Sequence, residues 1–272
     1  MKVILSRKGF DSANGGCPSP ILPDGTMLSL PIPGQSEPNK YSDLQYNGMK
    51  YQDIVEQLSP KKDKYEFCHL DPDLRSDIRT NEIKDWHPAF GQIGAAQGTL
   101  RNANVEEGDL FLFFGWFRKS KLENGRLRFS TPKDSSDFYD FADLQAIYGY
   151  LQIGKIITNP EEISTYWWHP HASSSRINEK NNALYIPSES LSFAKELPGF
   201  GVLNFREDRV LTMKGQSRSV WNPHDFLMPD KVYGNKKNSA ENVNGLSYAG
   251  IWQELIVNEC PELLDWAKSI IL

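Results

Sequence analysis

The sequence predicts a mixed α+β fold in which a mixed sheet forms the core of a single compact domain with peripheral helices. The length, 272 residues, suits one large domain, and 39% hydrophobic with 24% charged residues is a globular composition. The strongest apolar segments, 105–117 and 146–158, are rich in aromatic and β-branched residues, as buried strands are. Helical periodicity is confined to short segments around them.

In the N-terminal half, short apolar runs predict the strands. Val3, Ile4 and Leu5 indicate a buried strand over 2–5, and a loop rich in Gly and Pro follows it. Apolar residues at helical spacing predict a helix over 46–58, which ends before Pro60. A further short strand is expected over 65–70.

In the C-terminal half, the two long strands are followed by short ones, expected over 184–186 and 202–205. We expect 247–272 to form C-terminal helices. One is predicted over 250–257, and the last begins at Pro261, a residue favoured in the first turn of a helix.

Composition argues against several classes of protein. The formal net charge of −5 is not that of a generally basic nucleic-acid coat, although a local basic groove is compatible with it. Three cysteines without a CxxC pair argue against a disulfide framework and a thiolate zinc site. We expect a cytoplasmic protein without a signal peptide, because no apolar run has the length of a membrane span or leader.

The common cofactor motifs are missing from the sequence. It contains no Gly-x-Gly-x-x-Gly after a strand, no phosphate-binding loop, no His-Glu-x-x-His and no Gly-x-Ser-x-Gly. His169-Pro170-His171 offers two imidazoles, but no third ligand is evident, and an ordinary surface loop is the favoured interpretation. We therefore predict no metal and no cofactor.

A dense group of polar residues follows the first strand. Arg and Lys side chains suit phosphate, and Asp11 could act as a general base or stabilise a developing cation. The alternative is a strand end with an ordinary salt bridge and an Asp-Ser turn. The group and the loop after it contain Ser6, Arg7, Lys8, Asp11, Ser12, Asn14, Ser19 and Asp24.

A second acidic segment is His69-Leu70-Asp71-Pro72-Asp73. Two carboxylates after a strand can divide acid and base roles when their environments differ. An Asp-Pro turn is the alternative, and it is favoured if the segment is considered alone.

Several segments along the chain together form a recognisable set: 5–12 (LSRKGFDS), 18–21, 23–25, 29–33, 69–73, 108–115, 199–201, 211–212 and Trp221. This set resembles the nucleotide modification associated domain 3 family. The resemblance covers nearly the whole chain, and its first block is the most specific. It implies a role with hypermodified DNA bases, chiefly those of phages and of systems that confront them.

The segment 105–158 has a second similarity. Its Gly108-Asp109 turn and aromatic strand, with the later segment 149–156, are similar to small β-barrels of the PUA, ASCH and EVE kind. Such barrels hold modified bases or RNA, so the resemblance implies a PUA-like, barrel-type core. An ordinary hairpin is the alternative.

Chemistry on a base in duplex DNA requires the base to leave the stack. An extruded base needs an aromatic platform, polar groups for its edge, and cations for the flanking phosphates. For any single aromatic residue, core packing is the alternative. The candidates are Phe10, Phe114, Trp116, Tyr148, Trp167 and Trp168 for stacking, Asn14, Gln97 and His169 for the edge, and Arg7, Lys8, Arg101, Arg118 and Lys119 for phosphates.

Since no donor-binding motif is found, we predict a DNA glycosylase that hydrolyses the base–sugar bond of a modified base, for example a glycosylated base in phage DNA, as antiviral defence. Asp11 is the first candidate for the catalytic carboxylate, Asp71 is its substitute, and His169 could assist the leaving base. The expected partner is DNA with modified bases, without a membrane or an obligate protein partner. A transferase acting on a DNA base, a non-catalytic reader of modified DNA and an enzyme of free modified nucleotides remain open.

Overall fold

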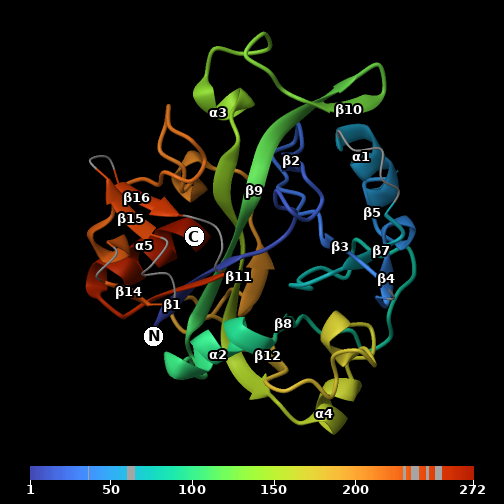
Figure 1. Cartoon of the computed structure of the whole chain (residues 1–272), viewed down its shortest axis with the longest axis vertical. Coiled ribbons are helices and arrows are strands. Elements are labelled where there is room, and N and C mark those ends of the chain that lie inside the picture. Colours follow the sequence, from blue (N-terminus) through green and yellow to red (C-terminus); the bar gives the residue numbers. More distant parts are fainter. Residues whose placement is uncertain (36, 60–64, 229–230, 234–238, 243–244, 249–252) are drawn as a thin grey trace.

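A curled, half-barrel sheet lies at the centre of the computed structural model (Figure 1). The structure describes residues 1–35, 37–59, 65–228, 231–233, 239–242, 245–248 and 253–272. Within these residues the mixed sheet has ten strands, which confirms the α+β class and a barrel-type core. Seven strands form its main path, in the order β14 (Val232–Tyr233), β17 (Glu254–Val257), β1 (Val3–Arg7), β9 (Leu110–Glu123), β11 (Leu144–Ile157), β12 (Ala183–Pro187) and β8 (Phe90–Gln92). The other three are β2 (Ser19–Ile21) and β10 (Arg126–Phe129), which pair with β9, and β13 (Phe200–Val202), which pairs with β11.

The strands β9 and β11 are the two long strands that the sequence predicts. They pair antiparallel, from Leu144 opposite Phe117 to Gln152 opposite Leu110. Side chains alternate between the two faces of β9, so that Leu112 and Phe111 belong to different hydrophobic clusters. Both faces of the first half of β9 are covered, which explains why residues 110–117 are almost continuously apolar, while the second half is mostly polar and more exposed.

The chain leaves the sheet between β1 and β2 and then returns to it. Both strands run parallel to β9, β1 beside its first half and β2 beside Phe117 to Lys119. The intervening loop passes close to Gly115 of β9, where an added Cβ would lie 2.8 Å from the Lys8 carbonyl oxygen. The polar residues after β1 therefore sit at a break in the sheet instead of continuing a strand.

A smaller layer lies beside the sheet, to the right of β9 in Figure 1. It has its own hydrophobic cluster, which includes Tyr41, Tyr51 and Ile54. The helix expected over 46–58 begins only at Tyr51, because residues 45–50 form a hairpin whose turn, Asn47-Gly48, has positive φ at both residues. The elements are β3 (Ile32–Gly34), β4 (Asn39–Lys40), β5 (Gln45–Tyr46), β6 (Met49–Lys50), α1 (Tyr51–Leu58) and β7 (Phe67–His69), with β3 and β4 pairing on either side of β7.

The remaining helices are short and peripheral (Figure 1). In the described part of the chain, none combines the length and the apolar character that a bilayer crossing requires. They are α2 (Gly94–Asn102), α3 (Phe138–Phe141), α4 (Pro160–Ser164), α5 (Pro261–Ile271) and the 3-10 helices η1 (Tyr41–Asp43), η2 (Pro170–Ala172), η3 (Glu207–Arg209) and η4 (Asp225–Leu227). A separate hairpin consists of β15 (Ser239–Asn242) and β16 (Gly245–Tyr248).

The C-terminal region differs from the two helices expected over 247–272. Helix α5 confirms the one that begins at Pro261. The helix expected over 250–257 is wrong for residues 254–257, which form strand β17 between β1 and β14, while residues 249–252 lie outside the described part. All four residues of β17 are buried, as in a strand covered on both faces, and a surface helix would expose one side.

Candidate functional site

A polar cavity of about 440 Å³ opens where β1, β3, β7 and β8 come together. Its wall contains three cations, three carboxylates and two histidines, together with amide side chains. A volume of this size is typical of small-molecule sites, about 300–1,000 Å³. The polar lining residues are Arg7, Lys8, Asp11, Asn14, Gln35, Glu37, His69, Asp71, Gln92, His171, Arg176 and Gln253.

Asp71 and three histidines form a cluster at this cavity. His69 is the last residue of β7, Asp71 follows it directly, and His171 lies in η2. The Nε2 atoms of His69 and His171 each lie 3.9 Å from Asp71 Oδ2. Each of the three side chains has one nitrogen or oxygen atom that could bind a metal ion, and these atoms lie within 4.8 Å of one another. His169 Nε2 lies 3.2 Å from the other oxygen, Oδ1.

The environment keeps the Asp71 carboxyl ionised. Its side chain is 4% exposed, and burial alone would raise its pKa. His169, His171 and Lys8 outweigh burial and hold the pKa of Asp71 well below its usual range. The Gly91 backbone N–H also donates to Asp71 Oδ1 at 2.8 Å. A negative charge is thus fixed in the cavity wall.

Neighbouring side chains orient each imidazole. His171 Nδ1 lies 2.7 Å from Asn182 Oδ1, and burial lowers the pKa of His171 to about 3, so its ring is neutral. His69 Nδ1 lies 3.5 Å from Glu37 Oε1. His169 Nδ1 accepts the His171 backbone N–H at 3.2 Å, which leaves the ring proton on Nε2, toward Asp71.

Gly91 of β8 has no side chain, and the His171 ring occupies the space where a side chain would lie. An added Cβ there would lie 2.2 Å from Cδ2 and 2.7 Å from Nε2 of His171, and such contacts force a shift. The same residue donates its N–H to Asp71. Glycine therefore lets η2 bring the His171 ring against β8.

Each cation of the cavity wall faces a carboxylate. Arg176 binds Glu37 with two hydrogen bonds, of 2.8 and 3.0 Å. The Arg176 and His69 contacts lower the pKa of Glu37, although burial raises it. Lys8 lies 3.3 Å from Glu254, which is buried, and Arg7 lies 3.7 Å from Asp11.

Asp11, the first catalytic candidate from the sequence, lines the cavity but has a structural set of contacts. Its Oδ1 accepts the backbone N–H groups of Ala13 and Asn14 at 2.8 and 2.7 Å. The Asn14 amide contacts both of its oxygens. Asp11 thus organises its own loop, and it also pairs with Arg7.

The candidates Arg7, Lys8, Asn14 and Asp71 line the same cavity. The remaining candidates of the sequence lie outside it, and their contacts are mostly structural. Ser6 donates to Glu254, Ser19 accepts from the Leu30 backbone N–H, Asp24 accepts from that of Thr26, and Gln97 accepts from the Tyr185 hydroxyl. Phe114, Trp168 and His169 are buried in the packed interior, while Trp167 is 64% exposed. Arg101, Arg118 and Lys119 bond to Asn181, Asp143 and Asp140.

A second cavity of about 450 Å³ adjoins the first, and Arg7 and Asp11 belong to both walls. Three further candidates, Phe10, Ser12 and Trp116, line this cavity. The Arg218 guanidinium lies 3.9 Å from the centre of a Trp116 ring and donates to the Ser12 hydroxyl at 2.7 Å. This is a cation–π pair at the surface of a cavity.

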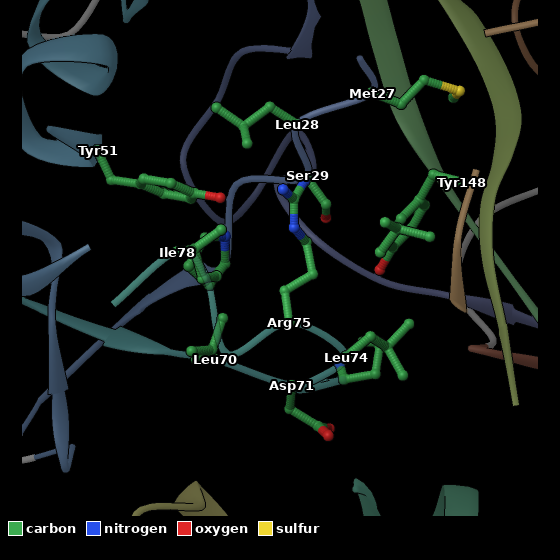
Figure 2. Close-up of a pocket in the computed structure, with 13 residues that line it drawn as sticks. Met27, Leu28, Ser29, Tyr51, Leu70, Asp71, Leu74, Arg75, Ile78 and Tyr148 are labelled. Atoms are coloured by element: carbon green, nitrogen blue, oxygen red, sulfur yellow. The ribbon is translucent and has the colours of Figure 1, made fainter. Parts of the chain in front are cut away.

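A third, much smaller cavity of about 40 Å³ lies beside the Asp71 segment (Figure 2). Tyr148, a stacking candidate, lines it together with Ser29 and Arg75. In Figure 2 the Asp71 carboxylate points away from these three side chains. The carboxylate therefore faces the larger cavity, as the histidines His69 and His171 do.

Several residues of the site were not among the sequence candidates: Glu37, His69, Gln92, His171 and Arg176. The signal for two of them was present, since His69 and His171 stand in the segments 69–73 and 169–171. Neither segment alone contains the whole cluster, because His69 and Asp71 come from the first and His171 comes from the second. Only the fold shows that the two segments meet.

The arrangement can fix a negative charge, accept hydrogen bonds through imidazole nitrogens, and hold an anion between the cations at its rim. No curated protein and no solved structure matches this chain. The family model described as nucleotide modification associated domain 3 matches residues 2–258, nearly the whole chain. As the sequence motifs predicted, this protein belongs to the nucleotide modification associated domain 3 family, whose members are involved in nucleotide modification systems.

Proposed function

We propose that this protein is an enzyme that hydrolyses the base–sugar bond of a modified base in DNA. The observation that supports this function best is the ionised, buried Asp71 carboxylate with its histidines on the wall of a cavity of about 440 Å³. Membership of a nucleotide modification family supports DNA with modified bases as the partner. Antiviral defence against phage DNA is the biological setting that we propose.

In this reaction the bond between C1′ and the base nitrogen breaks, and a bond forms between C1′ and a water oxygen. Positive charge develops on the sugar, so a fixed negative charge nearby lowers the barrier. Asp71 supplies that charge, and its low pKa suits charge stabilisation better than proton acceptance. The attacking water gives a proton to an imidazole nitrogen of the cluster, and the departing base nitrogen takes up one proton, so the number of protons is unchanged over the reaction.

The cations at the rim would bind the DNA backbone. Arg7 lines both large cavities, and Arg176 stands beside the histidine cluster. A guanidinium has five N–H donors, so each arginine retains donors after it pairs with its carboxylate. A base extruded between them would reach Asp71 with its flanking phosphates outside the cavity.

Geometry changes the ranking of the candidate carboxylates. Asp71 is enclosed by side chains from distant segments, while the oxygens of Asp11 are occupied by the loop that contains it. We therefore place Asp71 first and give Asp11 the role of holding the Arg7 loop. His169 lies behind Asp71 and does not line the cavity, so it acts through the carboxylate as a positioning residue.

The adjoining cavity favours a second candidate function, a transferase that elaborates a DNA base. Two cavities with a common wall suit a reaction with two substrates, and the Trp116–Arg218 pair offers a surface for a planar donor. Product formation that requires an added sugar or amino-acid donor would identify this function.

The test is incubation with plain DNA and with heavily modified phage DNA, followed by mass spectrometry of released bases. We expect free modified base from the modified DNA alone. Asp71→Asn should lower its release at least about 100-fold, the effect typical of a residue that stabilises transition-state charge. Asp24→Asn is the matched control, because Asp24 caps a turn and lies in neither large cavity. Tight binding of modified DNA without release would instead identify a reader.

A further inference from the structure

Two imidazole nitrogens and a carboxylate oxygen converge at the wall of the larger cavity. They are His69 Nε2, His171 Nε2 and Asp71 Oδ2, and both nitrogen–oxygen distances are 3.9 Å. Polar groups on the far side of each ring orient these atoms.

The contacts of Asn182 fix the tautomer of His171. The Asn182 Nδ2 group donates to the carbonyl oxygens of His171 and Arg176, at 2.9 and 3.1 Å. The Asn182 oxygen therefore faces His171 Nδ1, at 2.7 Å, and this nitrogen must be the donor. Nδ1 of His171 therefore carries a proton, and Nε2 is the ring nitrogen that faces Asp71.

His69 is turned the same way, with its Nδ1 3.5 Å from Glu37 Oε1 and its Nε2 3.9 Å from Asp71 Oδ2. Asp71 is arranged likewise, since Gly91 and His169 contact its Oδ1 and leave Oδ2 toward the two imidazoles. One atom of each of the three side chains thus lies within 4.8 Å of the other two, a spacing from which they can converge on one ion.

We infer that His69, Asp71 and His171 bind a divalent transition-metal ion at the wall of this cavity. Two imidazoles and one carboxylate with open positions are the ligands of catalytic zinc and non-haem iron sites. The outer partners match the support that such ligands require, because Asn182 orients the His171 ring, Gly91 holds the Asp71 carboxylate and Glu37 lies beside His69 Nδ1. The ligand atoms need to close only modestly around a common ion.

The charge balance of the cavity is compatible with such an ion. Its lining holds the cations Arg7, Lys8 and Arg176 and the carboxylates Asp11, Glu37 and Asp71, so the formal charges of the lining cancel. A divalent ion bound here would add positive charge beside the arginines that we propose to bind DNA phosphates. Imidazole ligands favour zinc, iron, cobalt or nickel over magnesium and calcium, which prefer oxygen.

The catalytic consequence of this site rests on the proposed function. A bound metal ion lowers the pKa of a coordinated water toward neutrality and so supplies a nucleophile. Asp71 would then act as a ligand, and the cluster would activate water through the metal. Metal binding itself is measured without a substrate, so either conclusion can fail alone.

The experiment uses the full chain, stripped with a chelator and titrated with Zn²⁺ by calorimetry, and with Co²⁺ by visible absorption. We expect one ion per chain, weak binding of Mg²⁺, and a cobalt spectrum without a thiolate charge-transfer band. His69→Gln should weaken Zn²⁺ binding at least about tenfold, the loss that even supporting residues of metal sites cause. His87→Gln is the matched control, because His87 is exposed and lies outside the cavity.

Several results would overturn the inference: no binding above that of Mg²⁺, a thiolate spectrum, or equal affinities of wild type and His69→Gln. Thermal unfolding in chelator verifies that the variant is folded, and the wild-type stoichiometry and spectrum decide the matter if it is not. Base release that survives the chelator would support the glycosylase function without a metal. Metal binding without base release would support the metal site and contradict the glycosylase function.

Discussion

Two regions of the cavity wall each hold a carboxylate, but the carboxylates differ in burial and in the origin of their hydrogen-bond partners. In the loop after β1, Asp11 is 22% exposed and is held by groups within four residues of it. In the histidine cluster, Asp71 is 4% exposed, and its partners come from β7, β8 and η2. A carboxylate satisfied by its own loop shapes that loop, while one surrounded by distant groups in a low-dielectric wall is available for chemistry.

The two regions have complementary roles in the proposed reaction. The loop carries Arg7, which reaches both large cavities, and the cluster carries the fixed negative charge. We therefore expect changes in the cluster to lower the rate of bond cleavage, and changes in the loop to lower substrate binding. Four variants test this division, in order of decreasing effect.

Gly91→Ala should produce the largest effect, a loss of base release of about 100-fold, because misplacement of a reactive group by about 1 Å can cost that much. The new Cβ would press on the His171 ring and disturb the segment that donates to Asp71. Release assays together with thermal unfolding measure this effect. Gly98→Ala in α2 is the control, since an added Cβ there meets nothing within 4 Å. Full activity of Gly91→Ala would show that the position of His171 is unimportant.

Arg7→Gln should weaken DNA binding about tenfold and leave the rate of release at saturating DNA within about twofold. The reason is the loss of one phosphate contact, which also lowers the slope of log affinity against log salt concentration by about one. Binding titrations at several salt concentrations measure both quantities. Arg206→Gln is a suitable control, because Arg206 pairs with Asp208 and lies outside both cavities. An unchanged salt slope would remove Arg7 from the DNA contact.

Asp11→Asn should have a smaller effect, with release lowered by no more than about threefold. The loop loses charge-assisted hydrogen bonds, so the free energy of unfolding should fall by about 1–2 kcal/mol. Chemical denaturation and the release assay with the same preparation test both statements. If Asp11→Asn abolished release and Asp71→Asn did not, the assignment of the two carboxylates would be reversed.

Trp116→Ala should have the smallest effect on hydrolysis, less than about twofold, because Trp116 lies in the adjoining cavity. The same variant should slow a donor-dependent transfer reaction, because it removes the free energy of one stacking contact with the donor, about 1–3 kcal/mol. Parallel assays with and without donors measure the difference. A large loss of hydrolysis would show that the extruded base occupies the second cavity.

Much of the fold could be predicted from local patterns. Aromatic and apolar runs predicted β9 and β11, and Pro261 marked the start of α5. Strand β17 was mistaken for a helix, because four consecutive buried residues have the same pattern in either structure. Its pairing between β1 and β14 decides the matter, and that pairing is a long-range property.

The candidate site was only partly predictable for the same reason. The Arg7–Asn14 segment is contiguous, and its polar density was visible in the sequence. The phosphate candidates Arg118 and Lys119 are also contiguous, but they pair with Asp143 and Asp140 outside both large cavities. Polar density indicates where chemistry is possible, and tertiary contacts determine which groups are already occupied.

By itself the sequence determined the family, the α+β class, the two central strands and the polar loop after β1, because each depends on residues that are close together in the chain. Tertiary structure alone decided that His69 and Asp71 meet His171, and that Asn182, Glu37 and Gly91 orient them. The physical reason is that tautomers and ionisation depend on hydrogen bonds and burial, which distant segments create only when the sheet and its neighbouring layer pack together.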